Sequence, residues 1–126
     1  MQQTIMTTQQ VADRYYELSQ QNKGAEIQDE LYAQNIVNRE PEHVAAMGMA
    51  IITTGLDAVK AKGKARREMT EAIHGGSCSA PVTAGRFFSM ALRRDITLKG
   101  KPRVQLEEIA VFEVKDGKIV SEQFFY

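Results

Sequence analysis

The stretch VQLEEIAVFEVKDGKIVSEQFFY, residues 104–126, decides how the C-terminal half of this chain is expected to fold. From Val104 to Val114 every second residue is apolar, except Glu108. Such alternation is typical of a half-buried β-strand. The Asp116-Gly117 dipeptide that follows is a strong signal for a two-residue hairpin. We therefore expect an antiparallel pair of strands with a carboxylate on its buried face.

A second alternating stretch, RFFSMALRRDITL, precedes this hairpin. One face of that strand would present Phe88, Met90, Leu92, Arg94, Ile96 and Leu98. If the 99–101 loop pairs Leu98 with Pro102, Leu92 faces Glu108, and Arg94 becomes a diagonal neighbour of Glu108 on the same face. The sequence thus predicts two ionisable side chains close together on an otherwise apolar sheet face.

The Asp116-Gly117 turn also predicts how the last strand is paired. It sets Lys115 opposite Lys118, which places Gln123 opposite Ala110 and inside the sheet. Together with Met90, Leu92 and Phe112, Gln123 would then line any pocket on this side. The opposite face mixes apolar and charged residues, so it is predicted either to meet a second copy of the chain or to be an ordinary half-solvated face.

The first half of the chain reads as helical. Thr7 and Gln10 have the spacing of a capping box, and Val11, Tyr15 and Leu18 recur at helical spacing as one buried stripe. A helix is expected at residues 25–32, a strand at 33–41 and a second helix, capped by Thr54, at 54–72. For residues 42–55 the sequence allows two alternatives, a short helix followed by a strand or a mobile flap. Helices followed by an antiparallel meander indicate an α+β domain whose curved sheet holds helices on one face.

Composition narrows the function classes. A chain of 126 residues is expected to be one domain, residues 1–126, and its 16 basic and 16 acidic residues cancel, which argues against a nucleic-acid partner. No apolar run is long enough to span a membrane, and the N-terminus lacks the pattern of a signal peptide. A single cysteine, Cys78, fits a reducing compartment, so we expect a cytoplasmic protein.

The strand ending in NREP and the ending EEIAVFEVKDGKIVSEQFFY resemble the SnoaL-like branch of the nuclear transport factor 2-like superfamily. The resemblance covers nearly the whole chain. It implies a cone-shaped α+β fold, in which a strongly bent antiparallel sheet wraps around helices and encloses a pocket, and a homodimer formed through the outer sheet face. The superfamily contains ketosteroid isomerase, polyketide cyclases, dehydratases and non-catalytic binding domains, so the fold alone leaves function open.

Comparison with ketosteroid isomerase implies roles for individual residues. Tyr15, in DRYY, matches the oxyanion tyrosine, and Glu40, before Pro41 in NREP, matches the catalytic base. The second oxyanion acid of that enzyme corresponds to Ala110 here, and Glu108 lies two residues earlier. Two strand positions correspond to about 7 Å, so the isomerase mechanism is not carried over intact.

Each candidate also has a purely structural interpretation. Glu108 is either a general acid or base or one half of a structural ion pair with Arg94. Tyr15 could be a core residue with a satisfied hydroxyl, Glu40 a solvated strand end, and His74 a structural histidine rather than a pocket residue. His43, His74 and Cys78 lack the spacing of metal ligands, so no metal site is expected.

Two functions follow from these residues. The first is a cofactor-independent isomerase, cyclase or dehydratase that moves a proton on a small, mostly apolar molecule. The second is a non-catalytic small-molecule carrier or dimeric adaptor. Glu108 and Arg94 would be central to the enzyme, with Tyr15, Glu40 and Gln123 around them.

Overall fold

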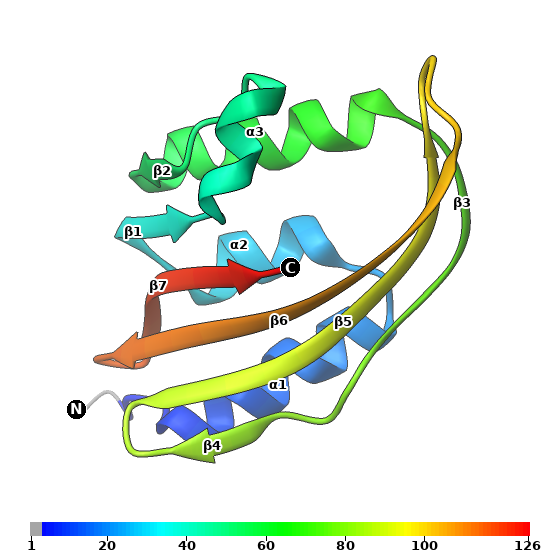
Figure 1. Ribbon diagram of the computed structural model, residues 1–126. Coiled ribbons are helices and arrows are strands. Elements are labelled where there is room, and N and C mark those ends of the chain that lie inside the picture. The colour runs from blue at the N-terminus through cyan, green and yellow to red at the C-terminus, as the bar shows by residue number, and fades with distance from the viewer. Residues whose placement is uncertain (1–3) are drawn as a thin grey trace.

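The computed structural model describes residues 4–126 and has an α+β fold (Figure 1). Its elements are α1 (Thr8–Gln20), α2 (Gly24–Leu31), β1 (Tyr32–Arg39), the 3₁₀ helix η1 (Glu42–Met47), β2 (Ile52–Thr54), α3 (Leu56–Met69), β3 (Thr70–Cys78), β4 (Val82–Ala84), β5 (Phe87–Leu98), β6 (Arg103–Lys115) and β7 (Lys118–Phe125). The long strands β5 and β6 bend around α1 and α2, and α3 lies across the other end of the curved sheet (Figure 1). This is the bent sheet with helices on its concave face that the sequence predicted.

The sheet is mixed, however, rather than antiparallel throughout. Its strand order is β2-β1-β7-β6-β5-β3, with β4 paired to β5. All neighbours are antiparallel except β1 and β7, which run parallel. Parallel strands need a long crossover, and here α3 and the whole β3–β6 meander supply it. The prediction was wrong at this junction because strand alternation contains no information about which distant strand becomes a neighbour.

The helix starts follow local chemistry. The predicted capping box is present: Thr7 Oγ1 accepts from the Gln10 amide at 3.2 Å, and the Gln10 side chain accepts from the Thr7 amide at 2.9 Å. The start of α3 differs from the prediction. Thr54 ends β2, where it pairs with Val37, and Gly55, at φ 91°, is the N-cap. A backbone turn that needs positive φ therefore replaces a side-chain cap.

The ambiguous segment between Pro41 and α3 forms a short helix and a strand. The 3₁₀ helix η1 ends at Gly48, which has a left-handed backbone, and β2 then pairs antiparallel with β1. This matches the first of the two alternatives for residues 42–55.

The two hairpins confirm most of the predicted pairings. Leu92 faces Glu108 in the β5–β6 ladder, and Lys115 faces Lys118 across the turn. Asp116 and Gly117 both have positive φ, 50° and 74°, as a two-residue hairpin turn of the right twist requires.

A β-bulge at Val120 overturns the predicted facing of the last strand. Val114 pairs with Ile119, but Glu113 pairs with Ser121, so Val120 is an extra residue in β7. Residues beyond it are displaced by one position, and Gln123 is exposed instead of lining a pocket. Inward-facing residues are the buried Glu122, opposite Phe112, and Phe124, opposite Ala110. One extra residue exchanges the two faces of a strand, because side chains alternate with a period of two.

The core lies between α1 and the inner face of β5 and β6. Phe88 and Phe112 stack with ring centroids 4.6 Å apart, and Tyr15 packs on Phe112 at 4.8 Å. Met90 is also fully buried in this cluster. Within residues 4–126, no helix is both long and apolar enough to cross a membrane.

Candidate functional site

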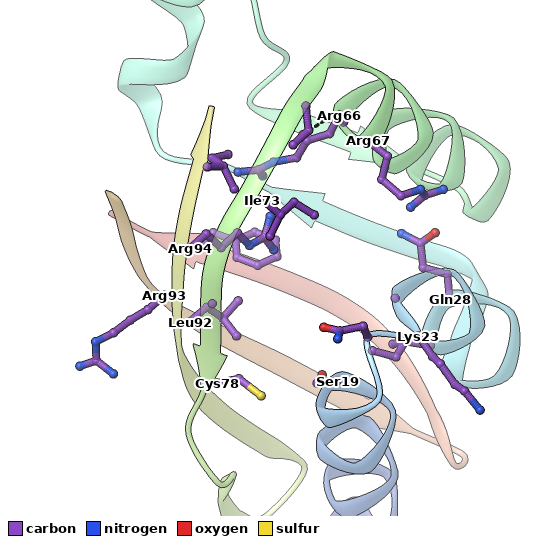
Figure 2. Close-up of a pocket in the computed structure, with 18 of the residues that line it drawn as sticks. Ser19, Lys23, Gln28, Arg66, Arg67, Ile73, Cys78, Leu92, Arg93 and Arg94 are labelled. Carbon is purple, nitrogen blue, oxygen red and sulfur yellow. Dashed lines mark hydrogen bonds between the residues drawn. The ribbon is translucent and has the colours of Figure 1, made fainter. Parts of the chain in front are cut away.

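A cavity of about 730 Å³ opens between the three helices and the concave side of the sheet (Figure 2). The ends of α1 and α2 form one wall, α3 forms the top, and β3 and β5 form the opposite wall. Apolar side chains in its lining include Ile27, Val59, Leu92 and Ile96. A space of this size, part apolar and part polar, has the character of a small-molecule site.

One wall of the cavity is a continuous chain of hydrogen bonds. The buried Glu122 carboxylate accepts from the Tyr32 hydroxyl and, at 2.9 Å, from the Asn38 amide. Lys62, from α3, donates to Asn38 at 2.6 Å and to Glu40 at 3.0 Å. The C-terminal Tyr126 completes the chain by donating to the other oxygen of Glu40 at 2.9 Å. This series of hydrogen bonds thus joins β1, β7 and α3.

Burial dominates the electrostatics of this wall. It raises the pKa of Glu122, against the lowering effect of the hydrogen bonds from Tyr32 and Asn38. Burial, followed by the nearby charge of Glu122, also raises the pKa of Tyr15 and of Tyr32. Both tyrosines therefore remain protonated donors at neutral pH, beside a carboxyl group that holds its proton unusually strongly.

The predicted Glu108–Arg94 pair is placed as expected but is not bonded. Both side chains lie on the concave side: Glu108 is buried, and Arg94 is half-buried in the cavity wall. The cation nearest to Glu108 is Arg66 of α3, at 3.9 Å from Nη2 to Oε2, and Oε2 has no hydrogen-bond partner. The structural alternative of a Glu108–Arg94 ion pair is therefore not formed, and α3 places Arg66 nearer to the carboxylate instead.

The other predicted residues divide into three groups. Tyr15, Glu40, Leu92 and His74 line the cavity, and His74 is exposed with its Nε2 at 2.8 Å from Thr97 Oγ1. Met90 and Phe112 are core residues that do not reach the cavity wall. Gln123 lies on the outer side of the sheet. Over residues 4–126 no group of three or more His, Cys, Asp or Glu is gathered as a metal site requires.

Sequence reasoning did not single out several polar residues of the cavity, among them Tyr32, Asn38, Lys62, Arg66 and Glu122. Two signals could have found some of them. Asn38 lies two residues before Glu40, so strand alternation places both on one side. Lys62 and Arg66 are four residues apart and therefore share a face of α3, although the basic run around them looked like a solvated helix surface.

Comparison with known proteins now identifies the family. The SnoaL-like domain model matches residues 6–126, and the chain therefore belongs to the SnoaL-like family. A proposed SnoaL-like polyketide cyclase from Mesorhizobium loti is 30% identical, with a TM-score of 0.88 over 96% of this chain and 100% of that chain.

More distant structures share the fold. A nuclear transport factor 2-like protein of unknown function from Burkholderia pseudomallei is 15% identical, with a TM-score of 0.76 over 96% of this chain and 92% of that one. A protein with a ketosteroid isomerase-like fold from Catenulispora acidiphila, solved with trimethylamine, is 16% identical, with a TM-score of 0.70 over 95% and 87%. No curated protein matches the chain.

Proposed function

We propose that this protein binds a small organic molecule in the cone cavity and moves a proton on it without a cofactor, as an isomerase, cyclase or dehydratase does. The observation that supports this most directly is Glu122, a buried carboxyl group with a raised pKa on the cavity wall. Carboxyl groups whose environment shifts them toward neutral pH are suited to take up and return protons. Membership of the SnoaL-like family is consistent with this class of chemistry.

The neighbours of Glu122 provide the complementary role. As an ionised group, Glu122 removes a proton from the ligand; as an acid, it returns the proton to another atom. Negative charge that develops on a ligand oxygen is stabilised by hydrogen-bond donors held in place before the reaction. Tyr15 is such a donor, because its raised pKa keeps the hydroxyl proton in place. Tyr32 donates its only hydroxyl proton to Glu122 and so positions that carboxyl group.

The residues first proposed as catalytic take different parts in this scheme. Glu40 has Lys62 on one oxygen and Tyr126 on the other, so we assign it to holding α3 and the C-terminus against the cavity. Glu108 stands behind Arg66, and we assign it to positioning that guanidinium. Arg94 remains a ligand-contacting residue.

A generic proton-abstraction substrate tests the proposal. 5-Nitrobenzisoxazole loses its ring C–H proton to a base while its N–O bond breaks, and it leaves as a coloured cyanophenolate. We expect the protein to accelerate this reaction beyond free acetate at the same pH, and Glu122→Gln to remove about a hundredfold of the rate. The control is Glu107→Gln, which changes a 77% exposed side chain on the outer face. Equal rates for the wild type and Glu122→Gln would refute the proposal.

A non-catalytic binding module is the second candidate, and one observation favours it. Both oxygens of Glu122 and both oxygens of Glu40 already accept hydrogen bonds. If the chain only binds, Glu122→Gln should leave ligand affinity unchanged and no proton transfer should be detectable.

A further inference from the structure

The cavity is strongly cationic although the chain as a whole is neutral. Five of the sixteen Lys and Arg residues present cationic side chains to it, but only two carboxylates line it. The cationic residues are Lys23, Lys62, Arg66, Arg67 and Arg94, whereas the neighbouring Arg93 points its side chain away from the cavity (Figure 2) and pairs with Glu107. Both carboxylates are already engaged, Glu40 by Lys62 and Glu122 by neutral donors. The positive charge therefore has too few counter-charges within the cavity.

Arg94 is the most exceptional of these residues. It shares a face with the buried Leu92 and Ile96, yet its side chain makes no hydrogen bond or ion pair with any residue among 4–126. Gly76 is its partner across the β3–β5 ladder and brings no side chain to cover it. A half-buried guanidinium has five N–H donors, and burying donors without acceptors is costly. Arg94 is therefore a donor group that lacks its acceptor.

Arg66 brings a second guanidinium to the same place. It extends from α3 toward the strands that hold Ile73 and Arg94 (Figure 2). The charge of Arg94 is among the causes that lower its pKa, after burial, so the two cations repel each other across the cavity. Glu108, at 3.9 Å, lies beyond hydrogen-bond distance and offsets only one of the two charges.

We propose that Arg66 and Arg94 form the recognition site for the carboxylate group of a small organic acid, whose apolar part lies against the apolar lining of the cavity. The planar fork of a guanidinium matches a carboxylate in a bidentate geometry. An incoming carboxylate supplies the acceptor that Arg94 lacks and relieves the repulsion between the two arginines. Leu92 and Ile96 flank Arg94 on the same face of β5, Val59 lines the same cavity, and these side chains suit an apolar or aromatic body. This inference rests on the proposed small-molecule role of the cavity and specifies the class of ligand.

Benzoate, benzamide and phenylphosphonate test the assignment, with affinity measured by calorimetry or by amide NMR shifts at low ionic strength. Benzamide has the shape of benzoate without the charge. We expect benzoate to bind about tenfold or more tightly than benzamide, and Arg94→Gln and Arg66→Gln each to remove about tenfold of the benzoate affinity. Arg94→Lys keeps the charge without the fork and should recover only part of that loss.

Arg93→Gln is the matched control. Arg93 is the next residue along β5, it is 61% exposed, and it pairs with Glu107 on the outer side. Its replacement removes the same charge from the protein but should change the benzoate affinity less than twofold, since exposed charges are screened. A thermal melt of each variant verifies that it is folded.

Several results would overturn the proposal. They are equal binding of benzoate and benzamide, equal losses for Arg93→Gln and Arg94→Gln, or phenylphosphonate binding tenfold more tightly than benzoate. The outcome is separable from that of the proposed catalysis. Benzoate binding without proton transfer supports the carboxylate site and refutes the enzyme, whereas turnover of 5-nitrobenzisoxazole without carboxylate preference does the reverse.

Discussion

At the scale of single residues, the cavity depends on carboxyl groups with different surroundings. Glu122 is buried among neutral donors, Glu40 is paired with a lysine, and Glu108 has one oxygen without a hydrogen-bond partner. The three groups lie on the concave side of the sheet, yet they have different chemical capacities. A carboxyl residue in such a site is therefore defined by its contacts more than by its side-chain type.

Glu122 should leave a signature in the pH dependence of stability. Its pKa is raised in the folded protein, so in the pH range just above the ordinary pKa of glutamate the folded state binds more protons than the unfolded state. Stability then falls as pH rises through that range. We expect Glu122→Gln to remove this slope, as measured by urea unfolding between about pH 4 and about pH 8.

Other groups act in the opposite direction, which makes a control necessary. Arg14 lowers the pKa of Glu30 and Arg103 lowers that of Asp95, so these carboxylates contribute stability that is lost as pH falls. They are unchanged in Glu122→Gln and cancel in the comparison with the wild type. An unaltered slope in Glu122→Gln, matching that of Glu107→Gln, would show that burial does not perturb Glu122.

At the scale of elements, the β6–β7 turn joins the hairpin to the N-terminal segment. Gly117 has φ 74°, and a Cβ placed there would lie 2.9 Å from Ile5 Cγ2 and 3.1 Å from the Met6 amide nitrogen. Gly117→Ala is therefore expected to destabilise the fold by about 1–2 kcal/mol, from left-handed strain and from this contact. Chemical denaturation measures the change.

Gly24→Ala is the corresponding control. Gly24 begins α2, and a Cβ there meets nothing within 4 Å. We expect it to leave stability unchanged or to increase it by a few tenths of a kcal/mol, because alanine favours a helix more than glycine does. If both alanine variants behaved alike, the turn geometry would not be the source of the effect.

The elements also show what could be predicted from the sequence. The capping box of Thr7, the Asp-Gly turn and the β5–β6 register depend on local spacing, and all three were predicted correctly. The bulge at Val120 and the parallel β1–β7 contact depend on packing between segments far apart in the chain, and both were missed. The same reason explains the site: Glu108 follows from alternation, whereas Lys62 and Arg66 enter the cavity only because of how α3 docks.

At the scale of the whole molecule, the outer face of the sheet is the surface where we expect a second copy. Ile109 and Phe125 face each other across β6 and β7 and are 48% and 50% exposed. Large apolar side chains side by side on a sheet favour a self-complementary contact. Sedimentation velocity should show a dimer for the wild type and a shift toward monomer for Ile109→Arg.

Ile52→Arg provides the comparison for that experiment. Ile52 is 53% exposed but lies on the short edge strand β2, so its replacement should leave the dimer intact. A wild-type protein that sediments as a monomer at all concentrations would instead indicate an ordinary half-solvated face.

The bulge at Val120 also determines how related chains should be compared with this one. Regular pairing from the turn would put Ser121 opposite Phe112, and the extra residue Val120 puts Glu122 there instead. Deleting Val120 should therefore straighten the hairpin and keep the same glutamate beside Tyr32, with its carbon-13 titration unaltered. A relative that lacks the extra residue would present its equivalent acid one place sooner after the turn. Alignments of the C-terminal segment should be anchored on the buried Phe–Glu pair, because counting onward from Asp-Gly would match that relative's interior acid with Ser121 of this chain.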